Sequence, residues 1–352
     1  MFICVRKTTG QTENRPFIFG IKTNYGFIIP HSENIKSISD ANPWSVELDF
    51  SLLNTKDEAY QLCFCYPKVG FTLSYINFNN PDIIGHGYTF LPFIEPVFGD
   101  QKKVRFSLRG SAGFIFLDQP YHETNNPQNF FYSTHLSFIL AMNFRLNYFI
   151  NDHISINASA NYNHTSNGGL KEPNKGINFP TASVGLDYNF RPAEFKTKEK
   201  VTLNDLYPNR NRIYIAPFYT AKNTVGDKKR YPIYGLYLTY SYIIARISAI
   251  NANIDLVVDH LVKNRIDSDS TGNSGTDHKT AGLMLGHDLL MGKFIFSVDI
   301  GIYLYKKHET KDNYYQRYGV KYLLNDHFFI GANLKAHRHV ADFLDFRIGY
   351  KF

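Results

Sequence analysis

The sequence predicts an all-β fold, a closed transmembrane barrel of antiparallel strands. Three observations support this prediction. Apolar and polar residues alternate along many segments of about ten residues or more. The turns between these segments alternate between short and long, the asymmetry expected of a membrane barrel. The chain also ends on an alternating segment whose last residue is the aromatic Phe352, which resembles the terminal strand of bacterial outer-membrane barrels.

The composition excludes a helical membrane protein. The chain has 352 residues, of which 43% are hydrophobic and 16% aromatic, and its mean hydropathy is −0.29. No apolar run approaches the roughly 18 residues that a transmembrane helix needs. Barrel strands alternate, so their apolar faces do not raise such averages.

Alternation alone leaves a soluble β-sandwich open. In the segment from Phe294 to Leu304, every second residue is apolar, with Ser297, Asp299 and Gly301 between them. In a sandwich the apolar face would form a core, whereas in a barrel it would face lipid and the polar face would line the lumen.

The pattern predicts about sixteen strands, within a range of 12–16. An even number places both chain ends on the periplasmic side, as bacterial barrels require. The count treats 59–78 as one strand, bent at Pro67 and Gly70. The predicted strands are 16–30, 44–54, 59–78, 86–97, 103–118, 131–150, 153–166, 180–191, 211–223, 231–247, 252–263, 278–290, 293–306, 314–325, 327–338 and 342–352.

We expect a single barrel over 16–352, preceded by an N-terminal segment at 1–15. Within it, 192–210 reads as a polar periplasmic connector with Lys196, Lys198, Glu199 and Lys200, and 211–352 as additional strands. The start of the chain has too few apolar residues to form a signal-peptide core, which needs about 7–15 residues. Since an outer-membrane barrel needs a signal, we expect one upstream or already removed.

Charge and motifs indicate few other partners. The net charge of +7 fits a solvated surface or attraction to anionic lipid head groups. The basic residues are scattered without a recognition motif, so we expect no nucleic acid. We expect no cofactor, because no phosphate or dinucleotide loop appears. We also expect no metal: Cys63 and Cys65 read as packing residues on one strand face, and His337 and His339 as polar residues at a turn.

The strand predicted at 153–166 carries the most informative pattern. Its odd positions are all polar, and its even positions are apolar until the last two, His164 and Ser166. Because side chains repeat with period two, both should lie on the lipid-facing wall. The strand follows the short turn at Asn151 and Asp152, so the pair should lie near the outer leaflet. The same parity in the next strand brings Asn178 to the outside, near His164.

These residues resemble a known family. The segment from His164 to Gly169, followed by Pro173 to Asn178, is similar to the signature of outer-membrane lipid A 3-O-deacylases over about residues 160–190. The resemblance extends more loosely over the first half of the chain, so that 16–191 is the deacylase-like part of the barrel. The resemblance implies that Ser166 is the nucleophile and His164 the general base. It implies that Asn174, with the backbone of Asn167 and Gly168, stabilises the oxyanion. The family's acidic residue falls on Asn178, and Glu172 is a possible substitute acid.

The resemblance predicts a bacterial outer-membrane esterase that removes an ester-linked acyl chain from lipid A, with lipopolysaccharide as its partner. The alternative is a non-catalytic barrel, either a channel or a structural subunit of an envelope complex with a protein partner. Asn178 in place of an acid and the additional strands motivate this alternative.

Overall fold

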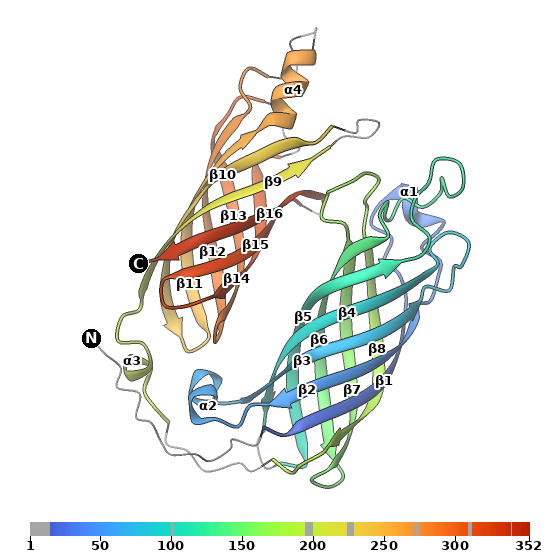
Figure 1. The fold of residues 1–352 in the computed structure, drawn as a ribbon, viewed down its shortest axis with the longest axis vertical. Helices are drawn as coiled ribbons and strands as arrows, with labels where there is room; N and C mark the ends of the chain where they lie inside the picture. Colours follow the sequence, from blue (N-terminus) through green and yellow to red (C-terminus); the bar gives the residue numbers. More distant parts are fainter. Residues whose placement is uncertain are drawn as a thin grey trace.

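The protein folds into sixteen antiparallel strands that form two closed barrels of eight strands each (Figure 1). The computed structural model describes residues 15–99, 102–193, 200–223, 229–269, 272, 275–308, 312–338 and 340–352. The predicted all-β barrel class and the number of strands are confirmed. The difference is that the strands close as two barrels instead of one.

The first barrel runs in chain order and closes where the last strand, β8, pairs with β1. Nine paired positions join them, from Ile18 opposite Asn189 to Gly26 opposite Thr181. Its strands are β1 (Phe17–Gly26), β2 (Trp44–Leu53), β3 (Tyr66–Asn77), β4 (His86–Phe98), β5 (Val104–Leu117), β6 (Leu136–Phe149), β7 (Ile154–Ser166) and β8 (Ile177–Asn189).

The second barrel closes by pairing β16 with β9. Its strands are β9 (Asn211–Lys222), β10 (Tyr231–Ala245), β11 (Ser248–Asp259), β12 (Lys279–Met291), β13 (Phe294–Lys306), β14 (Tyr314–Leu323), β15 (Phe328–His337) and β16 (Val340–Lys351). The expected connector at 192–210 includes the short helix α3 (Leu203–Leu206). Lys196, Lys198 and Glu199 lie outside the described residues, as does most of the expected segment 1–15.

Each barrel is apolar outside and polar inside, the reverse of a soluble protein. On β6, Leu140, Phe144 and Leu146 are about half exposed, at 48%, 52% and 57%, while Asn143 and Arg145 between them are buried. The outward face therefore suits lipid, and the inward face is a polar lumen. Closed barrels of this kind rule out the soluble β-sandwich.

The lumen of the first barrel is filled by a network of buried charges. Arg145 binds Asp187 at 3.1 Å, Glu95 at 3.3 Å and Asp49 at 3.5 Å. Arg109 binds Glu95 at 2.7 Å and Asp49 at 2.8 Å. All five side chains are nearly inaccessible. Eight strands enclose a space just wide enough for such side chains.

The second lumen is built in the same way around Arg317. Its guanidinium holds both carboxylate oxygens of Asp255 at 2.9 Å and reaches Asp345 at 2.6 Å. Arg347 binds the same Asp345 at 2.6 Å. Filled interiors in both barrels argue against the channel that the sequence left open.

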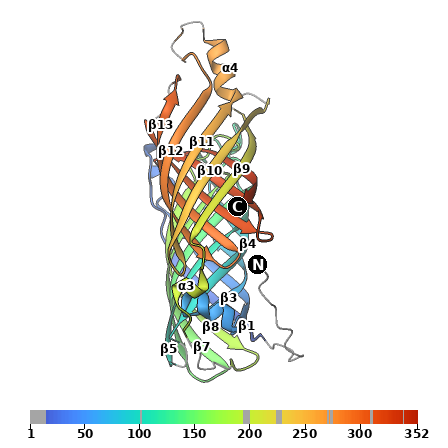
Figure 2. The same ribbon diagram turned by 90° about the vertical axis from the view of Figure 1, so that its left-hand side faces the viewer.

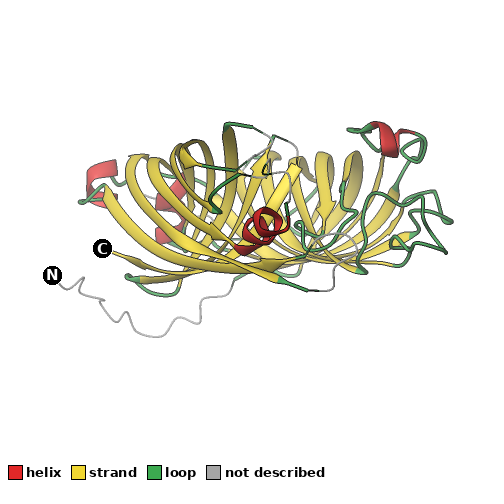
Figure 3. Cartoon of the chain, turned by 90° about the horizontal axis from the view of Figure 1, so that it is seen from above, coloured by secondary structure: helices red, strands yellow, loops and turns green. Residues whose placement is uncertain are grey.

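The helices lie in connections beyond the strand ends (Figures 1 and 3). They are α1 (Glu33–Lys36), α2 (Asp57–Cys63), α3 and α4 (His260–Ser268). Within the described chain, none of these helices has the length and apolar character to cross a membrane.

The prediction of one strand over 59–78 was wrong, because α2 occupies its first part and β3 starts at Tyr66. The helix ends on Phe64, whose φ of 52° reverses the chain. This turn brings Cys63 and Cys65 to a Cα separation of 5.1 Å, and they form a disulfide. They are therefore not packing residues on one strand face, as the sequence predicted.

The two barrels stand side by side and touch at both ends (Figures 1 and 2). At the end with short turns, Arg246 between β10 and β11 donates to the carbonyl of Gln61 in α2 at 2.6 Å and stacks on the Phe64 ring at 3.8 Å. At the end with long loops, Gly168 after β7 lies against Leu344 of β16, which is 3.3 Å from an ideal Cβ position on that glycine.

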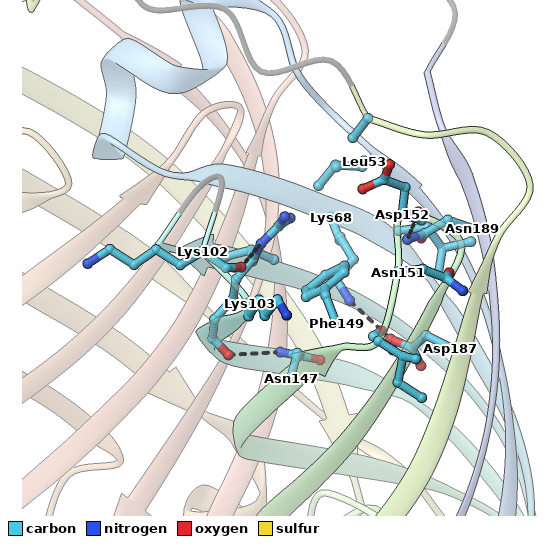
Figure 4. A pocket seen from close by; sticks show the side chains of 16 residues that line it. Leu53, Lys68, Lys102, Lys103, Asn147, Phe149, Asn151, Asp152, Asp187 and Asn189 are labelled. Atoms are coloured by element: carbon cyan, nitrogen blue, oxygen red, sulfur yellow. Dashed lines mark hydrogen bonds and ion pairs between the residues drawn. The ribbon is translucent and has the colours of Figure 1, made fainter.

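A cavity of about 410 Å³ opens at the short-turn end of the first barrel (Figure 4). Its wall includes Lys102 and Arg105 near the rim, and Lys68 and Asp187, which are 3.5 Å apart, deeper inside. The turn that precedes β7 also lines it. The cavity is therefore separated by the length of that 13-residue strand, roughly 40 Å, from the polar residues at the far end of β7.

The charge network predicts that Arg145→Met strongly destabilises the first barrel. The substitution leaves Glu95 and Asp187 buried with fewer counter-charges, which should lower the free energy of unfolding by about 3–5 kcal/mol. The measurement is denaturant unfolding in detergent micelles, followed by the fluorescence of Trp44. Lys102→Met, at an exposed position, is the control. Equal unfolding midpoints for the two variants would contradict the role of the network.

Candidate functional site

A group of polar side chains lies on the outer wall of the first barrel, where β7 and β8 reach the end with long loops. His164 of β7 stands directly opposite Asn178 of β8 in the strand register. Along β7, the alternating residues Ile156, Ala158, Ala160 and Tyr162 are exposed on the outward face. His164 and Ser166 continue this face by strand parity.

His164 and Asn178 form the shortest polar contact in this group. Nδ1 of His164 lies 2.6 Å from Oδ1 of Asn178. An amide oxygen only accepts, so Nδ1 carries the proton and Nε2 of the neutral ring keeps its lone pair. This is the state of histidine that can accept a proton from a hydroxyl. Among the described contacts, no hydrogen bond joins Ser166 to this ring.

Ser166 is only 8% exposed, although it belongs to the lipid-facing wall. The chain beyond it turns back over the strand end, and the backbone N–H of Gly168 donates to Ser166 Oγ at 3.4 Å. The serine therefore lies beneath its own loop, with one backbone donor beside its oxygen.

The loop that follows Ser166 is held by side chains that the sequence singled out. Oδ1 of Asn174 accepts from the backbone N–H of Asn167 at 3.0 Å. The Asn167 side chain, which is almost completely buried, donates to the Lys171 carbonyl at 2.7 Å. Glu172 accepts from the backbone N–H of Asn174 at 3.1 Å. Through this contact the Glu172 carboxylate binds the loop backbone and not His164.

Three loop glycines adopt conformations that favour glycine. Gly168 has φ of 68°, Gly169 has φ of 77° and Gly176 has φ of 73°. A Cβ on Gly176 would lie 3.0 Å from Cε1 of His164 and 3.3 Å from Cβ of Ser166. The loop backbone therefore approaches the histidine and the serine as closely as side-chain packing allows.

The loop before β6 supports the site from the barrel top. The carbonyls of Phe130 and Phe131 accept from the N–H groups of Lys175 and Gly176 at 3.0 and 2.8 Å. Tyr132 is buried and donates to the Ile84 carbonyl. Burial raises the pKa of Tyr132 well above its usual range, so the hydroxyl keeps its proton. In the same loop, the side chains of Asn126 and Asn129 donate to the backbone carbonyls of Ile83 and Gln119, respectively, and so have a structural role.

His31 also belongs to the site, although it was not predicted from the sequence. Nδ1 of His31 lies 3.3 Å from Nδ2 of Asn178, and Nε2 lies 2.8 Å from the Lys175 carbonyl. It comes from the loop after β1, far from His164 in sequence. Its only sequence signal was its position at the start of a long polar loop.

The residues considered as metal ligands do not gather into a site. Among the described residues there is no group of three or more histidine, cysteine or acidic side chains that could hold a metal ion. His337 is buried and shares a hydrogen bond of 2.8 Å with the Tyr303 hydroxyl, so it is not an exposed turn residue. His339 lies outside the described residues.

The fold and this outward-facing group define a class, the outer-membrane β-barrel proteins with a polar cluster on the lipid-facing wall. Two family models match the chain: the lipid A 3-O-deacylase model over residues 53–187, and the acyloxyacyl hydrolase C-terminal domain model over residues 211–352. The chain belongs to this family of the bacterial outer membrane. The second match spans the second barrel, whose strands were expected from the sequence only as additional strands of one barrel.

Two solved structures illustrate the likeness. Neisserial surface protein A is 11% identical, with 49% of this chain and 97% of that chain covered and a TM-score of 0.35. The outer membrane enzyme PagL is 15% identical, with 47% of this chain and 97% of that chain covered and a TM-score of 0.35. No curated protein sequence matches the chain. The family assignment rests on the two family models.

The close approach at Gly176 predicts that Gly176→Ala is costly. The added Cβ meets the His164 ring and the Thr165 carbonyl, both at 3.0 Å, so overpacking adds about 1–3 kcal/mol to the cost of a positive φ. Gly272→Ala is a matched control, because Gly272 has φ of 72° and nothing lies within 4 Å of its Cβ position. Chemical unfolding in micelles measures both. Equal losses would refute the contact.

Proposed function

We propose that this protein is an esterase of the outer membrane that hydrolyses an ester-linked acyl chain of lipid A. The observation that carries the proposal is the 2.6 Å contact between His164 and Asn178 on the lipid-facing wall, two residues from Ser166. It lies inside the segment that matches the lipid A 3-O-deacylase model. A lipid in the outer leaflet would lie against the wall that carries these residues.

In the proposed reaction, Oγ of Ser166 attacks the ester carbonyl while Nε2 of His164 takes the hydroxyl proton. The imidazolium then gives this proton to the sugar oxygen as its bond to the carbonyl carbon breaks, so the sugar leaves as an alcohol and an acyl-enzyme remains. Water, deprotonated by the same ring, attacks the acyl-enzyme and releases the fatty acid. The serine thereby regains its proton.

The loop supplies donors for the negative charge that develops on the carbonyl oxygen. The N–H of Gly168 already points to Ser166 Oγ at 3.4 Å. Oδ1 of Asn174 faces the N–H of Asn167, which turns the Nδ2 group of Asn174 to the other side. We assign the Gly168 N–H and Asn174 Nδ2 as oxyanion donors, and the N–H of Asn167 as the group that orients Asn174.

Asn178 takes the place of the acid in this scheme. Its amide oxygen holds the tautomer of His164 but carries no negative charge to stabilise the imidazolium. In a serine protease triad, exchange of the acid for its amide lowers turnover by about 10⁴, because the wrong tautomer results. Here the geometry keeps His164 protonated on Nδ1, so we expect turnover to be lowered only by the missing negative charge.

Loss of the nucleophile should abolish the activity. Mass spectrometry of lipid A from cells that make this protein should show loss of one acyl chain, and Ser166→Ala should leave lipid A intact. Ser248→Ala is a matched control, because Ser248 Oγ also forms a hydrogen bond with a histidine, His287 Nε2, at 2.6 Å, but on the second barrel and outside the site. An unchanged lipid A in cells with the wild-type protein would end the proposal.

Restoring an acid should accelerate the reaction. In Asn178→Glu the carboxylate adds a negative charge beside His164 and should raise turnover about tenfold or more, because each 1.4 kcal/mol of transition-state stabilisation is worth a factor of ten. Asn178→Ala should lower turnover. Fatty acid release from lipid A in mixed micelles provides the measurement. A fall in turnover with Asn178→Glu would contradict the role given to Asn178.

A further inference from the structure

We propose that His31 is a positioning residue, which orients the Asn178 amide so that its oxygen faces His164. The inference deepens the proposed function and rests on it for its kinetic consequence. It extends the site from two strands to the loop after β1, and it explains how an amide serves where a carboxylate would otherwise stand.

The loop that carries His31 is attached to the site by its backbone. The N–H of Ile29 donates to the Asn178 carbonyl at 2.8 Å. Two residues later, His31 spans the distance between Asn178 and the loop after β7. Its Nε2 lies 2.8 Å from the Lys175 carbonyl, and its Nδ1 lies 3.3 Å from Nδ2 of Asn178. A longer contact of 3.4 Å joins Nδ1 to the Ile29 carbonyl.

One assignment of protons satisfies the contacts that run from Lys175 through His31 and Asn178 to His164 when both rings are neutral, and it leaves the 3.4 Å approach of His31 Nδ1 to the Ile29 carbonyl without a hydrogen bond. The Lys175 carbonyl can only accept, so Nε2 of His31 carries its proton and Nδ1 keeps a lone pair. This lone pair accepts from Nδ2 of Asn178, which turns Oδ1 of Asn178 toward His164. Nδ1 of His164 must then donate, and Nε2 of His164 remains the base.

An amide needs this support and a carboxylate does not. The two ends of an asparagine amide are nearly equal in shape but opposite in hydrogen bonding. If Asn178 were turned over, its Nδ2 group would donate to Nδ1 of His164. The ring proton would then move to Nε2, and His164 would no longer accept the proton of Ser166. A carboxylate offers an acceptor at either end, so no neighbour has to select its orientation.

The kinetic test is therefore a comparison in two backgrounds, with lipid A in mixed micelles as substrate. His31→Phe should lower kcat about tenfold in the wild-type chain, the value of roughly one hydrogen bond. The same substitution should change kcat less than twofold in Asn178→Glu. His31→Gln retains an acceptor and should keep most of the activity. His122→Phe, in another loop of the same barrel end, is the control. Equal losses in both backgrounds would overturn the inference and indicate a merely structural role.

A second measurement does not depend on turnover. Histidine-selective ¹⁵N NMR of the full chain in micelles reports which ring nitrogen carries the proton. The inference predicts His31 protonated on Nε2 and His164 on Nδ1, with the His164 signals becoming a mixture of both tautomers in His31→Phe. A His164 tautomer that is unaffected by His31→Phe would overturn it. If the predicted tautomers are found and no acyl chain is released, the proposed function fails while the positioning role stands.

Discussion

The two-residue period of side chains along closed antiparallel strands is the constraint from which the rest of this structure follows. A chain that crosses a bilayer as strands must pair every backbone group, so each sheet closes on itself. Closure then divides the residues into an outer and an inner set. On β7 this division sends Asn157 and Asn161 into the lumen and Ile156 and Tyr162 toward lipid. The same division carries His164 and Ser166 onto the outer wall.

Much of the fold was predictable because the alternation of apolar and polar residues is a property of each strand's own sequence. Sixteen strands followed from alternation and turns, yet their closure did not, since alternation reads the same in one large barrel or two small ones. The pairing of Ile18 with Asn189 depends on distant residues. The helix α2 was also missed, because Tyr60 and Leu62 lie on either side of the polar Gln61, a spacing that also occurs in a strand. Its end at Phe64 depends on a local left-handed turn that a sequence pattern does not reveal.

The site divides in the same way between local and distant parts. His164, Ser166 and Asn178 lie within one hairpin, so strand parity and loop length were enough to bring them to one face. His31 comes from 133 positions before His164, and Leu344 from the second barrel. Their proximity results from closure of the first barrel and from the contact between barrels, neither of which has a local signature. The residues that the structure adds to the predicted site are therefore those that surround it, and not the three that lie within the hairpin.

The filled lumens have a consequence for how any molecule reaches the outer wall. Arg145 and Arg317 occupy the barrel axes with their carboxylate partners, so no solute arrives at His164 from within. Under the proposed function, lipid meets the site by lateral diffusion in the plane of the membrane, a two-dimensional search in which the local concentration of lipid is already high. Tight binding then brings little advantage, and a molecule released at the wall remains in the same leaflet.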